Sequence, residues 1–553
     1  VSQRTSEDTS SLLCVRADDR PALTEGLRAL VQGGGQAARS ASSGRLTLAL
    51  IAESPADLRG LVQDAIGRLE RDEPIEEPGR MHLALEPCGP EGLAWLFPGQ
   101  GSQRVGMLRD LRGVLPGFDE ALRARDAEAE ALLGRSLLRQ FLDPVSDPAL
   151  EAELKLTHNA QLSVGLASYA LAETLSGLGI APRFLAGHSY GELPALSCGG
   201  AYSFAELVRL SAERGRLLGG AAAEIPGSML AVASDPGWVG AQLEGLPGPL
   251  VLANLNGPRQ VVASGTLAGI NALEARCREA RIATTRLKTA CAFHSPLMAP
   301  VRSEWERFLA EREFAAPRGV VSSVSAAELS GAAAVAPSLA EQIVAPVRWV
   351  ETVEALYAAG ARVFLEIGPA RVLSGLTQRI LRGRAHQVLP LEAKRPKGTA
   401  RLRLLDLLAR LAAQGVPLAW ERFSRGYEHA LAEAPGQDLA RTYFASARGA
   451  VETFFAQQDQ ALQSLGPASP GATQAVLAQM LETNRAVLQE LLETQAAGLA
   501  YFGGQAPALP ELPGGRVPAA AARGGDVAAL LREEICKLTG FPPEVVLPTS
   551  EFE

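Results

Sequence analysis

The segment Gly187-His-Ser-Tyr-Gly191 carries the clearest chemical signal in the sequence. An apolar run at 184–186 precedes it and a helical pattern at 192–197 follows it, which predicts a tight turn between a strand and a helix. Such a turn lifts the serine hydroxyl clear of the backbone, and the flanking glycines leave room for the close approach that this requires. The pattern therefore favours Ser189 as a nucleophile over a serine in an ordinary turn.

A serine hydroxyl is a weak nucleophile near neutral pH and needs a general base. The chain has six histidines, of which His188 adjoins the serine and is expected to point away from it. Four others lie in linker-like, loop or ordinary sequence: His82, His158, His386 and His429. His294 ends a predicted strand beside a proline turn, where catalytic side chains are often displayed. Elimination makes His294 the best candidate for the base. A purely structural role for His294 is an equally good interpretation at this point.

The third candidate group is cationic. The helical pattern at 203–218 contains Arg209, Arg214 and Arg216. A guanidinium in an apolar cleft can hold a carboxylate through two parallel hydrogen bonds. Such charge-assisted bonds, at about 1.5–3 kcal/mol each, would select a dicarboxylic acyl group over acetyl. From the residues alone, three solvated helix arginines are the simpler interpretation.

The elements that must position these residues follow an α/β pattern. Strands and helices alternate from about 91 to 390, as is typical of a mostly parallel sheet. Within this region, 226–290 has the order strand, helix, strand, strand, helix, strand, which predicts a ferredoxin-like insert. Residues 1–90 contain two strand-then-helix units. We therefore predict an α/β-hydrolase-like parallel-sheet core with an inserted ferredoxin-like subdomain, preceded by a small α/β module.

Helical and linker-like sequence follows this core. Residues 391–435 form a linker around an amphipathic helix at 400–414. Residues 436–525 are helical and then rich in Pro, Gly and Ala, and the helix at 475–495 is expected to pack one face on a neighbour rather than to form a coiled coil. Residues 526–553 begin another helix.

Composition excludes several classes of function. The 61 acidic and 53 basic residues give a net charge of -8, which disfavours nucleic acid as a partner. No apolar run approaches the roughly 18 residues of a membrane span, and no signal peptide is visible. The six cysteines form no CxxC pair. We expect a cytoplasmic protein with reduced thiols and no metal site.

Six motifs stand in the order found in malonyl-type acyl-carrier-protein transacylases. They are Phe97-Pro-Gly-Gln-Gly-Ser-Gln103, Gly187-His-Ser-Tyr-Gly-Glu192, Glu213-Arg-Gly-Arg216, Asn254-Leu-Asn256, Ala292-Phe-His-Ser-Pro296 and Glu366-Ile-Gly-Pro369. Over roughly residues 10–425, the chain resembles the acyltransferase region, with its flanking linkers, of a type I polyketide or polyunsaturated-fatty-acid synthase. In such a synthase, residues 1–90 correspond to the ketosynthase-to-acyltransferase linker and 391–435 to the linker that follows the acyltransferase.

The resemblance implies roles for the residues at these motifs. Ser189 would be the nucleophile and His294 its base, oriented by backbone carbonyls rather than by an aspartate. The backbone amides of Gln100 and Tyr190 would form the oxyanion hole, with each donor contributing roughly 2.7–4 kcal/mol at the transition state.

Three further residues would contact the substrate. Arg214 would bind the malonyl carboxylate, and Asn256 belongs to the same substrate-binding set. Phe293 resembles the malonyl-selective pattern, in which a bulky residue before the histidine crowds an α-methyl group.

The implied reaction moves a malonyl unit from malonyl-CoA, through an ester on Ser189, to the phosphopantetheine thiol of an acyl carrier protein. No bound cofactor is implied. The partners would be the acyl carrier protein and the ketosynthase of the same synthase, which would be a homodimer. Residues 526–553 resemble the truncated start of a carrier protein, without its pantetheine attachment site.

Two other functions compete with this interpretation. A serine esterase or thioesterase shares the elbow and the histidine, but it would place an acidic partner between serine and histidine in chain order. A catalytically silent scaffold domain is the other alternative, which the joint presence of Ser189, His294, Arg214 and Gln100 disfavours.

Overall fold

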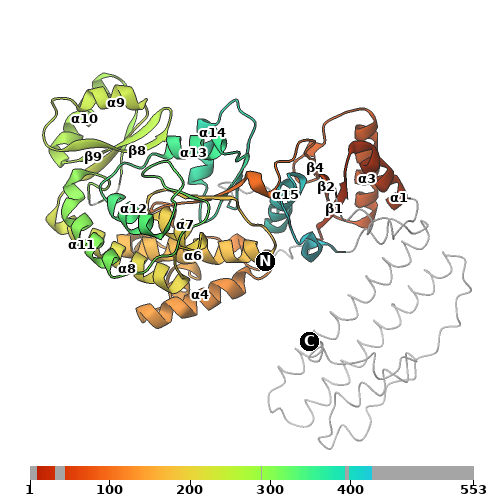
Figure 1. Ribbon diagram of the computed structural model, residues 1–553, viewed down its shortest axis with the longest axis horizontal. Helices are drawn as coiled ribbons and strands as arrows, with labels where there is room; N and C mark the ends of the chain where they lie inside the picture. Colours follow the sequence, from red (N-terminus) through yellow and green to blue (C-terminus); the bar gives the residue numbers. More distant parts are fainter. Residues whose placement is uncertain (1–8, 32–43, 288, 290, 393–397, 426–553) are drawn as a thin grey trace, which may run out of the picture. The chain divides into compact units, whose positions relative to one another are not determined.

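Figure 1 shows the computed structural model, which describes residues 9–31, 44–287, 289, 291–392 and 398–425. The chain divides into two units, Val1–Ala432 and Glu433–Glu553, and all the described residues belong to the first. The segments predicted at 436–525, with the helix at 475–495, and at 526–553 lie outside the described residues. No helix within the described ranges combines the length and apolar character needed to cross a bilayer.

Five strands form the sheet that carries the elbow. They are β5 (Leu93–Phe97), β6 (Phe184–Gly187), β11 (Val320–Val321), β12 (Val363–Glu366) and β13 (Gln387–Pro390). Their order is β11-β6-β5-β12-β13, and every pairing is parallel. Because Phe97 lies opposite Gly187, β5 and β6 deliver the chain after each of them to the same edge of the sheet. The predicted parallel α/β core is confirmed.

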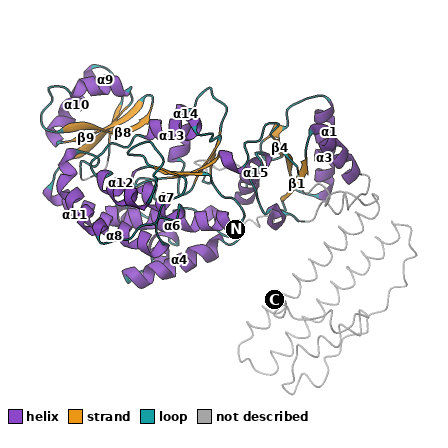
Figure 2. Ribbon diagram, in the orientation of Figure 1, coloured by secondary structure: helices purple, strands orange, loops and turns teal. Residues whose placement is uncertain are grey.

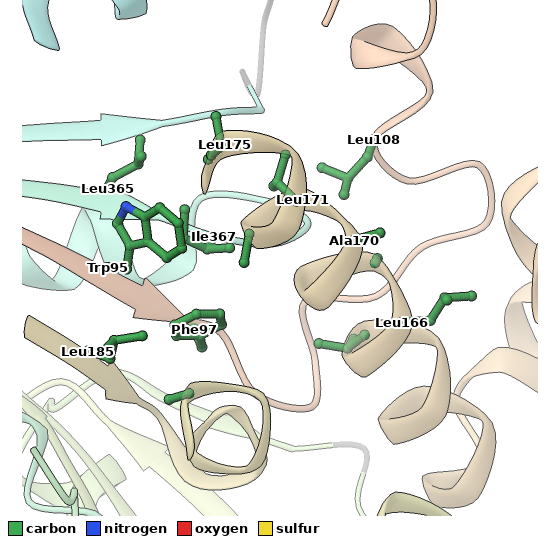
Figure 3. Close-up of a cluster of buried hydrophobic side chains, with 14 of the residues drawn as sticks. Trp95, Phe97, Leu108, Leu166, Ala170, Leu171, Leu175, Leu185, Leu365 and Ile367 are labelled. Atoms are coloured by element: carbon green, nitrogen blue, oxygen red, sulfur yellow. The ribbon is translucent and has the colours of Figure 1, made fainter. Parts of the chain in front are cut away.

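Helices pack on both faces of this sheet and on one another. They are α4 (Phe118–Leu133), α5 (Pro148–Leu154), α6 (Thr157–Gly177), α7 (Glu192–Cys198), α8 (Phe204–Glu224), α11 (Ala299–Ala310), α12 (Val335–Glu341), α13 (Trp349–Ala358) and α14 (Val372–Ile380). Successive strand residues point to opposite faces. Figure 3 shows Trp95 and Phe97 on the face that packs against α6. Their neighbours Ala94 and Leu96 join the apolar cluster of α13 and α14 on the other face.

The insert is a small antiparallel sheet with two helices (Figure 2). Its elements are β7 (Ser228–Val232), α9 (Pro236–Leu243), β8 (Leu250–Gly257), β9 (Gln260–Gly265), α10 (Leu267–Glu279) and β10 (Thr284–Arg286). The strand order β10-β7-β9-β8 places the first and third strands at the centre, and the predicted ferredoxin-like arrangement is confirmed.

One strand of the insert is longer than the sequence predicts. The apolar pattern ends at Ala253, whereas β8 continues to Gly257. The reason is a tertiary contact: the Leu255 amide donates to the Val347 carbonyl at 2.9 Å, and the Val347 amide donates to the Ala253 carbonyl at 2.8 Å. The insert is thereby joined to the core just before α13, beside the Asn254–Asn256 motif.

The N-terminal module is a separate four-stranded antiparallel sheet. Its strands are β1 (Ser11–Ala17), β2 (Leu46–Ala52), β3 (Glu76–Glu77) and β4 (Met81–Leu83), in the order β1-β2-β4-β3. Helices α1 (Arg20–Val31) and α3 (Pro55–Glu70) bury their apolar sides on one face of β1 and β2. Helix α15 (Ala400–Ala413) contributes to the cluster on the other face. A helix from the predicted second linker therefore completes the first module.

His82 lies in β4 and is buried, so the prediction that it lies in loop-like sequence is wrong. Its Nε2 lies 2.8 Å from Asp406 Oδ1 on α15. The tertiary partner, which is more than 300 residues away in the sequence, keeps this polar ring in a buried position.

Candidate active site

The turn between β6 and α7 has the backbone geometry of a nucleophile elbow, with Ser189 partly buried. Ser189 has a φ of +52°, in the left-handed region that non-glycine residues rarely adopt. A Cβ at Gly187 would lie 2.0 Å from the Gly191 carbonyl carbon, and a Cβ at Gly191 would lie 2.0 Å from the Phe97 carbonyl oxygen. Both glycines are therefore required by close backbone approaches, and together they hold the strained serine in place.

Ser189 and His294 form a hydrogen-bonded pair. Ser189 Oγ lies 2.7 Å from His294 Nε2. His294 Nδ1 lies 2.9 Å from the Gln342 carbonyl oxygen and 3.1 Å from the Ala345 carbonyl oxygen. Because a carbonyl can only accept, Nδ1 carries the proton and Nε2 is free to accept the serine proton. Within the described residues no carboxylate contacts His294, which is the arrangement of backbone acceptors that the resemblance implies.

The environment keeps His294 neutral. The side chain is buried, and burial, followed by the positive charge of Arg214 and by His188, lowers its pKa to about 3. An imidazole with such a pKa is unprotonated at neutral pH, as a general base must be.

The structure separates the three arginines of α8. Arg209 pairs with Glu206 at 3.2 Å and Arg216 pairs with Glu213 at 2.7 Å, both near the surface. Arg214 is only 4 % exposed and has no ion pair among the described residues.

Arg214 is held within the site by an amide instead. Its Nη2 donates to Gln342 Oε1 at 3.1 Å, and its buried Nε has no hydrogen-bond partner in the described part of the chain. Burial lowers its pKa to about 10, at which it stays charged at neutral pH. A buried cation that makes no direct ion pair with a described residue is costly, so the site is suited to a ligand that brings an anionic group.

Two loops meet where an oxyanion would lie. A Cβ at Gly99 would lie 2.4 Å from the His188 carbonyl oxygen and 3.6 Å from the Tyr190 amide nitrogen, so the loop holding Gln100 abuts the elbow. The Gln100 side chain donates to Thr157 Oγ1 at 3.4 Å. The two backbone amides are thus on adjacent loops, and their role as oxyanion donors stays a prediction.

The Tyr190 side chain points into the protein, away from the solvent. It is fully buried, and its hydroxyl lies 2.8 Å from Ser211 Oγ on α8. A Cβ at Gly165 in α6 would lie 2.3 Å from that hydroxyl oxygen. Three elements therefore meet beside the elbow with little free space between them.

His188 and Asn256 form a second pair. His188 Nε2 lies 2.7 Å from Asn256 Oδ1, and the ring packs edge-on against Trp349 with centroids 5.5 Å apart. The expectation that His188 points away from Ser189 is confirmed. The amide oxygen of Asn256 is occupied by His188, so its placement indicates support of the elbow, and its substrate contact stays a prediction. Phe293 is half-buried between the core and the insert.

Sequence reasoning missed the residues that support His294 and Arg214. Gln342 contributes a main-chain oxygen to His294 and a side-chain oxygen to Arg214, and Ala345 contributes a main-chain oxygen. A carbonyl acceptor leaves no signature in side-chain type. Glu192 stands directly after the elbow and is fully buried, and its place in the motif is the one signal that could have drawn attention to it. The described residues contain no group of three or more His, Cys, Asp or Glu placed to hold a metal ion.

A serine hydrogen-bonded to a neutral histidine, with a buried cation in the same site at the carboxyl edge of a parallel sheet, is an arrangement suited to acyl transfer. Residues 94–413 match the family model described as acyl transferase domain, and the chain belongs to that family.

Among its relatives, the chain is 35 % identical over 303 residues to the malonyl CoA-acyl carrier protein transacylase of Bacillus subtilis, covering 52 % of this chain and 90 % of that protein. It is 34 % identical over 366 residues to the polyketide synthase GfsA of Streptomyces halstedii, covering 63 % of this chain but only 5 % of the synthase. A solved malonyl-transacylase, in complex with a type II polyketide acyl-carrier protein, matches with a TM-score of 0.52 and 32 % identity, over 58 % of this chain and 99 % of that one.

Proposed function

We propose that this chain transfers a malonyl unit from malonyl-CoA, through an ester on Ser189, to the phosphopantetheine thiol of an acyl carrier protein. The observation that carries the proposal is the buried Arg214, which has no ion pair among the described residues, in the same site as the Ser189–His294 pair. The transacylase activity named for the Bacillus subtilis relative supports it, because the chain spans 90 % of that protein.

The first half of the reaction loads the enzyme. Ser189 Oγ attacks the thioester carbonyl carbon while His294 Nε2 takes the hydroxyl proton. The carbonyl oxygen becomes an oxyanion, which the amides of Gln100 and Tyr190 would bind, each donor contributing roughly 2.7–4 kcal/mol. The carbon–sulfur bond then breaks, and His294 returns its proton to the departing CoA thiolate. The product is the malonyl ester of Ser189.

The second half repeats these steps in reverse with a different thiol. The carrier protein's pantetheine thiol gives its proton to His294 and attacks the ester carbonyl. The carbon–oxygen bond to Ser189 breaks, and His294 reprotonates the serine oxygen. The same groups serve both halves because each step needs one proton acceptor and one set of oxyanion donors.

Arg214 would give the site its preference for malonyl. A free carboxylate on the acyl group could accept from the unpaired Nε and from an Nη of the guanidinium, in the two-bond geometry that arginine favours. An acetyl group leaves the buried cation without a counter-ion, which is the costlier complex. Phe293, next to the base, would narrow the space for an α-methyl group.

We further propose that the chain is a segment of a polyketide or polyunsaturated-fatty-acid synthase of the cytoplasm. Residues 1–90 and 391–435 would be its linkers around an acyltransferase at 91–390, with 436–525 leading to a carrier protein that starts at 526–553. The match to a polyketide synthase over 63 % of this chain supports this context. The ketosynthase and the carrier protein of that synthase, as a homodimer, would be its partners.

The test is the covalent intermediate. The purified chain is mixed separately with malonyl-CoA, methylmalonyl-CoA and acetyl-CoA, and its intact mass is measured, with Ser189→Ala as the control. We expect a malonyl adduct that is absent from the variant and that disappears on addition of a pantetheinylated carrier protein. CoA release without a lasting adduct would indicate a hydrolase, and no reaction of the folded chain with any donor would indicate a silent scaffold.

A further inference from the structure

Glu192 is a buried carboxylate that the proposed reaction does not use. It begins α7, directly after the elbow, and is 0 % exposed. Oε1 accepts hydrogen bonds from Ser322 Oγ at 2.8 Å and Ser338 Oγ at 3.3 Å. Oε2 accepts from the Ser323 hydroxyl at 2.8 Å and from the Ser323 amide at 3.1 Å. Four donors satisfy the buried charge, as a carboxylate in this position requires.

These donors come from two segments distant in sequence. Ser322 and Ser323 follow β11, whereas Ser338 lies in the last turn of α12. The Ser322 and Ser338 hydroxyls also lie 3.1 Å from each other. Glu192 therefore joins the elbow helix to the end of α12.

The end of α12 leads directly to the catalytic groups. The Gln342 amide donates to the Ser338 carbonyl at 3.0 Å and ends the helix. The main-chain oxygen of Gln342 then accepts from His294, and its side-chain oxygen accepts from Arg214. A single residue thus contacts the base through its backbone and the cation through its side chain.

We propose that Glu192 is a positioning residue, which acts through Ser338 and the end of α12 to hold Gln342 against both His294 and Arg214. The proposal rests on the proposed function, because it assigns to one anchor both the orientation of the base and the placement of the carboxylate-binding cation. The electrostatics agree with this geometry. Burial raises the pKa of Glu192, and its serine donors and the Gln342 side chain oppose that rise, while the Glu192 charge opposes the lowering of the Arg214 pKa.

The change Glu192→Gln tests this link with little change in volume. An amide keeps one acceptor oxygen but offers two donors to a pocket whose donors include the Ser323 backbone amide, which cannot turn away. A misplacement of about 1 Å at a catalytic group can cost about 10²-fold in rate. Asp126→Asn is the matched control, because Asp126 is also buried and accepts from a serine hydroxyl and an amide, those of Ser136 and Leu138, away from the site.

Two rates are measured on the full chain and on each variant. The first is labelling of Ser189 by a fluorophosphonate, which needs the Ser189–His294 pair and the oxyanion donors but not Arg214. The second is acylation by malonyl-CoA relative to acetyl-CoA, which also needs Arg214. For Glu192→Gln we expect labelling to slow by about tenfold or more and the malonyl preference to fall by about tenfold or more. Asp126→Asn should change neither rate per folded molecule.

A comparison of single and double variants at Glu192 and Gln342 provides a second test of the proposal. Gln342→Leu keeps the main-chain oxygen and removes the acceptor for Arg214, so it should lower the malonyl preference more than the labelling rate. If Glu192 acts through this residue, the double variant should lose no more malonyl preference than the worse single variant. Full additivity would overturn the proposal, as would a folded Glu192→Gln chain with unchanged labelling and preference.

The design separates this proposal from the proposed function. If the chain is labelled by the phosphonate but takes no acyl group from any CoA ester, the proposed function fails, and the labelling rates alone still decide the role of Glu192. If Glu192→Gln does not fold, Ser338→Ala replaces it, since this variant leaves the carboxylate with its other three donors. It should shift both rates in the same direction by a smaller factor, and unchanged rates would overturn the proposal.

Discussion

At the scale of single residues, the site pairs a serine with a histidine whose second nitrogen faces two backbone oxygens. Two neutral carbonyls fix the tautomer without adding a negative charge beside the ring. A carboxylate in that position would raise the pKa of the imidazole, whereas here burial and Arg214 lower it to about 3. The histidine is therefore neutral at any physiological pH, with Nε2 unprotonated and facing the Ser189 hydroxyl.

This low pKa makes a prediction about stability. The folded-state pKa of about 3 lies below the ordinary value of 6.5, so between these values the unfolded chain takes up a proton that the folded chain refuses. The contribution of neutral His294 to the free energy of unfolding is therefore fully present above about pH 6.5 and is lost as the pH falls toward about 3. We expect His294→Gln to lose less free energy of unfolding between about pH 7.5 and about pH 5 than the unmodified chain does. Urea unfolding at both values measures it, and equal losses would contradict the assignment.

Replacing Arg214 is expected to lower malonyl acylation much more than it changes stability. In Arg214→Met the two charge-assisted bonds to the malonyl carboxylate are lost, so we expect malonyl acylation to fall by about 10²-fold or more, from about 3 kcal/mol of binding, with acetyl acylation retained. The free energy of unfolding should change little, because the cost of burying a cation without a direct ion pair is removed together with its attraction to the Glu192 charge. The control is Arg209→Met on the same helix, which removes only a surface pair with Glu206.

At the scale of helices and strands, the local sequence predicts much of the fold. The bounds of α3 and α9 agree with the apolar pattern, because Ser54 and Asp235 cap these helices and a proline follows each cap. The elbow motif is also visible locally, since its two glycines and the serine lie within the five residues 187–191. Elements whose ends are set by their own caps or turns are thus readable from sequence.

The supports of the site are not readable in this way. Gln342 acts through a main-chain oxygen that any residue would provide, and it reaches His294 only because α12 ends beside that residue. Glu192 is satisfied by serines from two distant segments, and no spacing in the sequence joins them. The end of β8 likewise depends on its pairing with Val347. These features follow from tertiary contacts, which override local patterns.

The contact between α6 and the elbow makes a prediction about packing. We expect Gly165→Ala to lower the free energy of unfolding by about 1–3 kcal/mol, because its Cβ would lie 2.3 Å from the Tyr190 hydroxyl oxygen in a filled space. Tyr190→Phe removes that oxygen, so the double variant should recover part of the loss. Gly177→Ala in the same helix meets nothing within 4 Å and serves as the control. An equal cost with and without the Tyr190 hydroxyl, in denaturant unfolding, would show that the collision is not the cause.

At the scale of the whole described unit, the chain segments before and after the acyltransferase core fold together. The sheet of β1 and β2 has α1 and α3 on one face and α15 on the other, although α15 lies more than 300 residues later. Asp406 of α15 is the polar link in this arrangement. Its Oδ1 accepts from the Gly79 amide at 2.5 Å and pairs with His82, while Oδ2 accepts from Arg410 at 3.0 Å.

This link predicts acid-sensitive stability of the module. Burial alone would raise the pKa of Asp406, yet its hydrogen bonds with His82 and Gly79 lower it to about 2, below the ordinary 3.8. The stabilisation is therefore complete above about pH 3.8 and is lost as pH falls toward about 2. We expect Asp406→Asn to lower the free energy of unfolding at neutral pH by about 1–3 kcal/mol, a deficit that shrinks as the pH approaches 3.

The control is Asp110→Asn, which removes an exposed pair between the core and Arg403 of the same helix and should cost at most about 1 kcal/mol. The acylation rate of Ser189 tests whether the N-terminal module affects the active site. Because Asp406 contacts the N-terminal sheet and not the elbow, the folded fraction of the Asp406→Asn chain should acylate at the unmodified rate, while its denaturant midpoint falls. A lower acylation rate per folded molecule would mean that the contact between the flanking segments also sets the geometry of Ser189 and His294, and that the linkers are part of the catalytic unit.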